Sequence, residues 1–308
     1  ASVGTSAGKR QAFRCVVSGA AIPYDYIREA GKSGQMGSEL LAVVAEGHKG
    51  RVYLAPTDAQ VEAAKSAAPE WSPTTQLPDN PRDFKTPNYG LTSFGDLFTS
   101  RQLSAINAFC EAAIEAKDFL AQQALVAGFS AQGEGLEHDG CGATAYAEAI
   151  SLYLAFSISK ALTRNCALAI WEPGMGRLAG ALGRQAFPMQ WSFAETNPFA
   201  GAGGDISGTA KSVSEVLDQL VLPVPGKIKQ SNAADIQNVR PVVFSTDPPY
   251  YDNIIYADLS DFFYIWLRRT AGHIYPSMLS TLVTPKAEEM VVAPNRHSSK
   301  AVADAFFS

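Results

Sequence analysis

The chain has 308 residues, of which 46% are hydrophobic, and its 30 acidic and 25 basic side chains give a formal net charge of −5. This length can bury a sizeable core, and the negative charge excludes a global attraction to nucleic acid, so any such binding has to use a local basic patch. No stretch is long and apolar enough to span a membrane, and the first residues contain no apolar signal core. We therefore expect a cytoplasmic protein with no membrane partner.

Residues 1–60 predict a small β-rich unit. Three segments between residues 13 and 56 are rich in β-branched and aromatic residues, and glycine-containing turns separate them. A structural zinc site needs paired thiolates or imidazoles at short spacing, and this unit has a single cysteine. We expect a metal-free unit and reduced cysteines at Cys15, Cys110, Cys141 and Cys166. Residues 61–98 are rich in Pro and Asn and predict a connector between two domains.

Residues 99–308 predict an α/β domain. Thr99 and Gln102 have the spacing of a capping box at a helix N-terminus, and apolar residues follow them at helical spacing. Further helices are expected over residues 143–162, 212–220 and 256–269, and strands within residues 184–199 and 242–246. Helices that alternate with short buried strands indicate a sheet with crossover connections.

The sequence DPPY follows directly after the second of these strands. Loops at the carboxyl ends of strands hold the ligands of open α/β sheets, and this loop consists of Asp247, Pro248, Pro249 and Tyr250. DPPY matches motif IV of the amino-group DNA methyltransferases, in which Asp, Asn or Ser precedes two prolines and an aromatic residue. A proline-stiffened turn without a catalytic role is the alternative interpretation of these four residues.

The residue types of this motif suit the chemistry of such an enzyme. An exocyclic amine on a base is a poor nucleophile, because its lone pair is delocalised into the ring. The Asp247 carboxylate and the Pro248 carbonyl would accept the two hydrogens of the amine and free its lone pair for a methyl group. The Tyr250 ring would offer a flat face on which the extruded base can stack.

Longer segments resemble one family. They are STDPPYYDNIIYADLSDFFYIWLRR, PNYGLTSFGDLFTSRQL, RQAFPMQWSFAETNPF and LVTPKAEEMVVAPNRH, and they are similar to the large bacterial adenine-specific DNA methylases that carry a zinc-ribbon insertion. The resemblance spans nearly the whole chain. It implies an S-adenosylmethionine-dependent methyltransferase with a Rossmann-like sheet, which acts on the exocyclic amine of adenine in DNA. DPPY is equally compatible with cytosine. Relatives that bind zinc have paired cysteines in the ribbon, so residues 1–60 would be a degenerate ribbon.

The glycine-rich cofactor loop of such methylases is not recognised in this chain. We therefore expect a central fragment of a longer protein, and no cofactor-binding residue is assigned. The stretch NPFAGAGGDISG, residues 197–208, contains suitable glycines, but the resemblance places it in another element and favours a surface loop. The alternative function is a non-catalytic DNA-binding or assembly module of a restriction or phage-defence system, whose other subunits would be its partners.

Residues near the motif are candidates for binding the DNA substrate. Tyr251, Asp252 and Asn253 would position the base, with turn formation as the alternative role. Arg268 and Arg269 end the helix expected over residues 256–269, where cations are favoured in any case, and contact with phosphate is the sharper interpretation. The histidines share no spacing, and no GxSxG elbow indicates a hydrolase.

Overall fold

The structure, a computed structural model, describes residues 12–220, 226, 228, 230–232, 241–247, 249–297 and 299–307. Its helices are α1 (Tyr24–Lys32), α2 (Asp58–Lys65), α3 (Ser100–Val126), α4 (Ala143–Leu162), α5 (Ile206–Gln219), α6 (Tyr256–Ala271) and α7 (Lys300–Phe307). Its strands are β1 (Phe13–Arg14), β2 (Ala21–Ile22), β3 (Val43–Gly47), β4 (Gly50–Leu54), β5 (Ile170–Glu172) and β6 (Arg177–Ala179). Short 3-10 turns are η1 (Thr86–Tyr89), η2 (Gly95–Leu97), η3 (Leu136–His138) and η5 (Pro294–Arg296).

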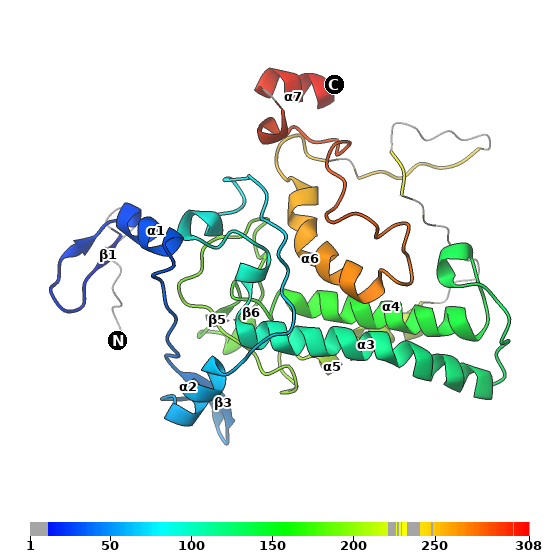
Figure 1. The fold of residues 1–308 in the computed structure, drawn as a ribbon, viewed down its shortest axis with the longest axis horizontal. Helices are drawn as coiled ribbons and strands as arrows, with labels where there is room; N and C mark the ends of the chain where they lie inside the picture. Colours follow the sequence, from blue (N-terminus) through cyan, green and yellow to red (C-terminus); the bar gives the residue numbers. More distant parts are fainter. Residues whose placement is uncertain are drawn as a thin grey trace.

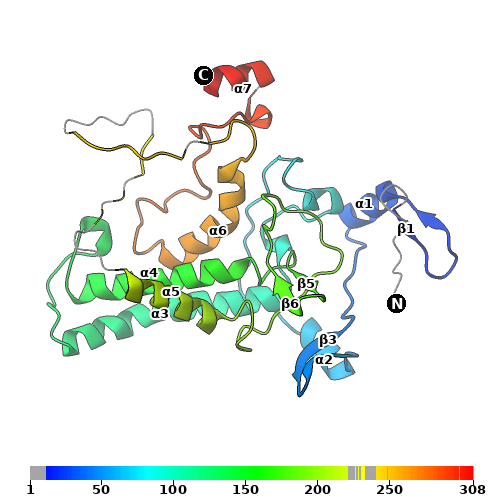
Figure 2. The ribbon, with the colours of Figure 1, turned by 180° about the vertical axis from the view of Figure 1, so that it is seen from behind.

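Long helices form the centre of the molecule. α3 and α4 lie side by side, α5 packs along α4, and α6 packs against both α3 and α4 (Figure 1, Figure 2). Aromatic side chains join α6 to the segment before α3: the Phe98 ring stacks on Phe262 with centroids 5.5 Å apart, and Trp266 meets Phe98 edge-on at 5.4 Å. Phe262 and Trp266 are almost fully buried, so the core lies where α6 meets α3 and α4.

The long helices begin where local signals predict them, with one exception. Thr99 and Gln102 form the expected capping box at α3, and α4 has the expected bounds. α5 begins at Ile206, six residues before the expected start at 212. The reason is a cap that the prediction did not use: the Asp205 carboxylate accepts a hydrogen bond from the Gly208 amide at 2.8 Å, which satisfies the first turn.

The chain combines helices with small sheets, but the predicted crossover sheet is not formed by the described residues. Their strands make three separate antiparallel pairs, β1–β2, β3–β4 and β5–β6. The strand predicted over residues 242–246 is wrong for this structure: Val243 and Phe244 are 97% and 62% exposed. A strand needs a neighbour for its backbone donors and acceptors, and no described segment supplies one. Residues 184–199 contain a single parallel bridge, between Phe187 and Phe84.

The connector, residues 61–98, contributes to the main core. Phe84, Phe94 and Leu97 are almost fully buried, and they belong to the same apolar cluster as the facing sides of α3 and α6. The connector is therefore a packed segment, which brings its polar residues beside the first turns of α6. The division of the chain into domains at residues 60 and 98 stays a prediction.

The N-terminal unit consists of β1, β2, α1, β3 and β4. Its β3–β4 hairpin contacts the β5–β6 hairpin: the indole of Trp171 on β5 donates a hydrogen bond to the hydroxyl of Tyr53 on β4 at 3.0 Å. Within the described part of the chain, no helix has both the length and the apolar character that crossing a bilayer requires.

Candidate functional site

The motif loop, defined here as residues 247–253, joins the irregular segment 241–246 to α6. Asp247 is exposed, and Tyr250 is 58% exposed and donates its hydroxyl hydrogen to Asp247 Oδ1 at 3.3 Å. The negative charge of Asp247 and this hydrogen bond raise the pKa of Tyr250, because both oppose loss of the phenolic proton. The structure therefore brings the predicted carboxylate and the predicted stacking ring together, in contact with solvent. Pro248, the predicted carbonyl acceptor, lies outside the described residues.

The two tyrosines of the motif loop point to different partners. Tyr251 has a φ of +58° and binds α7, since its hydroxyl donates to the Asp304 carboxylate and accepts from Lys300 Nζ at 3.3 Å. Its carbonyl accepts a hydrogen bond from the Val292 amide at 3.0 Å. Tyr251 was predicted to bind substrate, and the structure places its side chain against α7.

The rest of the motif loop is a turn that is fixed by the connector. The Asn253 amide donates to the Tyr250 carbonyl at 3.1 Å, and the Asp252 carbonyl accepts from Arg82. Arg82 also binds the carboxylate of its neighbour Asp83, at 3.0 Å from both oxygens. Asp252 and Asn253 therefore have turn-forming contacts within the chain, and their predicted roles toward a base stay predictions.

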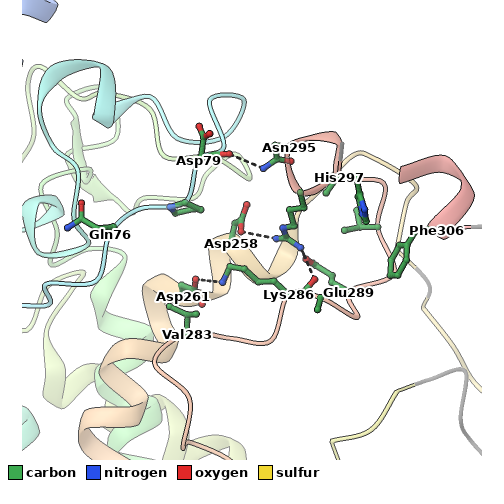
Figure 3. A pocket seen from close by; sticks show the side chains of 15 residues that line it. Gln76, Asp79, Asp258, Asp261, Val283, Lys286, Glu289, Asn295, His297 and Phe306 are labelled. Atoms are coloured by element: carbon green, nitrogen blue, oxygen red, sulfur yellow. Dashed lines mark hydrogen bonds and ion pairs between the residues drawn. The ribbon is translucent and has the colours of Figure 1, made fainter. Parts of the chain in front are cut away.

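A buried ion-pair network lies at the first turn of α6 (Figure 3). Asp258 is 1% exposed and accepts from Arg296 Nη2 at 2.8 Å and from Asn80 Nδ2 at 3.1 Å. Arg296 also binds Glu289, whose other oxygen accepts from the Ala257 amide at 2.9 Å. Ile255 at the N-cap position has no side chain that could cap the helix, so Glu289 supplies this cap from a distant segment. The network fixes the end of α6 that follows the motif loop.

One turn later, a second buried carboxylate has its own partners. Asp261 accepts from the Thr284 amide at 2.8 Å and the Thr284 hydroxyl at 2.7 Å, and it forms an ion pair with Lys286. The Lys286 side chain is 25% exposed, although a lysine in the polar stretch TPKAEE would be expected at the surface. Its ammonium group neutralises Asp261.

A cavity of about 610 Å³ lies beside these two networks. The connector, α6, residues 283–297 and α7 line it, and Figure 3 shows Asp79 and Phe306 at its border. Its polar lining includes Asp258, Asp261 and Lys286, all of which have partners within the chain. None of the described residues of the motif loop lines this cavity. Its volume would suit a small molecule, and its described lining combines the carboxylates of Asp79, Asp258, Asp261 and Glu289 with the cations of Lys286 and Arg296.

Arg268 and Arg269 lie at the far end of α6. Twelve residues separate Arg268 from Tyr256, which is about 18 Å along an α-helix. Arg268 Nε donates to the Leu279 carbonyl at 3.2 Å, while Arg269 pairs with Glu111 at 3.1 Å and lies 4.5 Å from the centre of the Trp71 ring. The structure does not bring these arginines to the motif loop, and their contact with phosphate stays a prediction.

The glycine-containing loop at residues 197–208 is closed on itself. Asp205 accepts hydrogen bonds from the Gly201 and Gly208 amides, both at 2.8 Å, and these bonds lower the pKa of its carboxyl group. The Gly204 carbonyl is bound by Asn165 at 2.8 Å. Since these amides already bind a carboxylate of the chain, the loop is not a cradle for a phosphate or a cofactor. Among the described residues we find no glycine-rich cradle that fits S-adenosylmethionine.

The sequence analysis did not identify the residues that hold the motif loop in place. They come from the connector (Asn80, Arg82 and Asp83), from residues 289–296 (Glu289, Val292 and Arg296) and from α7 (Lys300 and Asp304). The charged residues of PDNPRD and PNRH were the available signal, because charges within apolar surroundings need partners.

Within the part of the chain that the structure describes, no three His, Cys, Asp or Glu side chains are grouped so that they could hold a metal ion. Comparison of the chain with models of protein families, with characterised proteins and with solved structures found no match.

Proposed function

We propose that the chain is part of a DNA methyltransferase that modifies the exocyclic amine of adenine. The observation that carries this proposal is the pairing of Asp247 and Tyr250, two exposed side chains 3.3 Å apart on the loop that precedes α6. A carboxylate beside a flat ring is what an extruded amino base requires: the carboxylate accepts an amine hydrogen while the ring stacks on the base. The membership of the methylase family and a Rossmann-like sheet in the protein belong to the same proposal, although residues 242–246 form no strand in this structure.

Asp247 would act by polarising the amine. Its hydrogen bond to the amine strengthens as the nitrogen becomes tetrahedral, so Asp247 stabilises the transition state more than the bound substrate. S-adenosylmethionine would supply the methyl group. The amine hydrogen that is lost would leave as a proton, and the Asp247 carboxylate that binds the amine would receive it. The Tyr250 hydroxyl binds Oδ1, and the second carboxylate oxygen of Asp247 can accept the amine hydrogen.

Two cations contact the motif loop and would be the groups nearest to it that can meet a DNA phosphate. Arg82 binds the Asp252 carbonyl, and Lys300 lies 5.4 Å from the centre of the Tyr251 ring. Both are partly exposed, so they can meet phosphates while keeping their partners in the chain. Arg82 pairs with Asp83 and Lys300 pairs with Asp304, so a phosphate would have to compete with these carboxylates.

The proposal is tested by transfer of tritiated methyl groups to DNA from a methyltransferase-deficient host, followed by separation of the nucleosides. The chain and any longer product of its gene are assayed. We expect label in N6-methyladenine. Tyr250→Ala should weaken binding of the extruded base by roughly 5- to 150-fold, because the stacking surface is lost. Asp218→Ala changes an exposed carboxylate on α5 and serves as the matched control. Label in N4-methylcytosine would show that the substrate base is cytosine and not adenine. Absence of label with both the chain and any longer product would refute the enzymatic proposal.

The second candidate is a non-catalytic DNA-binding or assembly module. The exposed apolar residues Val243 and Phe244 favour it, because such side chains are commonly covered by another chain. The loop at residues 197–208 favours it as well, because its glycine amides bind Asp205 and so do not form a cradle for a cofactor. Calorimetric titration with S-adenosylmethionine separates the two functions: heat of binding supports the enzyme, and its absence in every form supports the module.

A further inference from the structure

We infer that Tyr251 is a positioning residue whose contact with α7 sets the arrangement of Asp247 and Tyr250. This inference rests on the proposed function, since it assigns a role within the same site. Adjacent tyrosines in a loop would ordinarily be interchangeable candidates for stacking on a base. Here they are not, because Tyr250 binds Asp247 and Tyr251 binds Asp304.

The backbone of Tyr251 is the first support for this role. A φ of +58° places it in the left-handed region, which is unfavourable for a bulky side chain. Such a conformation persists only where surrounding contacts hold it. The bond from the Val292 amide to the Tyr251 carbonyl, at 3.0 Å, is one such contact, and Val292 itself is fully buried. The turn is thus tied to the interior of the molecule.

The side chain of Tyr251 is the second support. Its hydroxyl lies between Asp304 and Lys300, which are one turn apart on α7 and pair with each other at 3.6 Å. The tyrosine therefore has both a hydrogen-bond acceptor and a cation at its hydroxyl. These bonds raise the pKa of Lys300, because the Tyr251 hydroxyl accepts from it and the Asp304 charge favours its protonated form.

α7 is itself attached to the body of the molecule, so it can act as an anchor. Ala303 is fully buried, and the Phe306 ring lies 5.2 Å from the His297 ring, just after η5. η5 contains Arg296, which pairs with Asp258 on α6. The motif loop is consequently held at Tyr251 from one side and at the start of α6 from the other. If this anchor were removed, Asp247 and Tyr250 would sample many orientations, and few of them would suit the reaction.

The test compares Tyr251→Phe, Asp304→Ala and the double variant with the parent protein. Phenylalanine keeps the ring and removes only the hydroxyl. We expect kcat to fall roughly 10- to 100-fold with KM within about twofold, because binding groups remain while their orientation is lost. The double variant should be no worse than the worse single variant, since both changes break one contact. Asp304→Asn retains an oxygen that accepts the phenolic hydrogen, so it should keep most of the parental rate.

A second readout does not depend on methyl transfer. Amide hydrogen exchange at Val292 and Asn253 reports the loop directly, because these amides bond to the Tyr251 and Tyr250 carbonyls. We expect exchange roughly three- to tenfold faster in Tyr251→Phe and Asp304→Ala. Glu215→Ala, which breaks the comparable Lys211–Glu215 pair on α5 at 3.8 Å, and Tyr26→Phe on α1 should change neither readout.

The outcomes separate the two claims. Parental exchange rates or a parental kcat in Tyr251→Phe would overturn the positioning role even if the protein methylates DNA. If the parent transfers no methyl group, the proposed function fails and the catalytic part of the inference fails with it, while hydrogen exchange still decides whether the anchor exists. Faster exchange together with a reduced kcat supports both claims.

Discussion

Replacement of Arg296 by methionine should destabilise the protein strongly. Arg296 Nη2 lies 2.8 Å from Asp258 Oδ1, and the Asp258 side chain is almost completely buried, with Asn80 as its other partner. Methionine fills a similar volume but leaves the buried carboxylate without a countercharge. Breaking a buried pair on one side costs roughly 3–5 kcal/mol, and we expect about 3 kcal/mol here because Asn80 remains. A loss of that size corresponds to a fall in Tm of roughly 5 °C for a chain of this length.

The assay is urea unfolding followed by circular dichroism, with Arg177→Met as the matched control. Arg177 pairs with Glu172 at the same 2.8 Å, but its side chain is 63% exposed against 17% for Arg296. Exposed pairs contribute about 0–1 kcal/mol, so this variant should remain close to the parent. Adding Asp258→Asn to Arg296→Met should recover about 1–2 kcal/mol, because the buried charge is removed. Equal stabilities of Arg296→Met and Arg177→Met would refute the reasoning.

Three further predictions concern ionisation, thiol reactivity and metal. Asp247→Asn should lower the pKa of Tyr250 toward its ordinary value. Ultraviolet titration of tyrosine ionisation measures this pKa, with the spectrum of the same variant carrying Tyr250→Phe subtracted. An unchanged pKa would contradict the contact. Burial raises the pKa of Cys166 to about 12, so Cys166 should react with a thiol reagent only after unfolding, whereas the exposed Cys141 should react in the native protein; mass spectrometry of the labelled peptides distinguishes them. Elemental analysis should find no stoichiometric zinc, and zinc that is lost on replacing Cys15 would contradict the degenerate ribbon.

The helices were predictable because their signals are local. The capping box of Thr99 and Gln102 lies within one turn, and the apolar spacing that follows indicates the buried side of α3. The start of α5 was predicted too late. Asp is a common N-cap residue, but the glycine at 208 favoured a loop in the sequence, whereas the first turn of a helix tolerates glycine. The strand over residues 242–246 was inferred from composition alone, whereas a strand exists only with a neighbour.

The sequence motif pointed to two residues that the structure brings together, and their catalytic role stays a prediction. DPPY identifies Asp247 and Tyr250 by their chemistry, and the structure places their polar groups in contact. The residues that fix the loop lie far away in the sequence: Arg82 is 170 positions from Asp252, and Asp304 is 53 positions from Tyr251. No local pattern encodes such pairs, because they arise from packing of the connector and α7 around α6.

The turnover of Asp247→Ala tests the central claim most directly. The assay is transfer of tritiated methyl groups to DNA, with binding of S-adenosylmethionine and circular dichroism measured on the same samples, and with Asp218→Ala as the control. Removal of one preorganised electrostatic contact lowers the rate on the order of 100- to 1,000-fold. We expect that loss in Asp247→Ala, with cofactor binding and fold unchanged and with parental turnover in the control. Parental turnover in Asp247→Ala would show that the motif is a stiff turn and would contradict its assignment as the catalytic group.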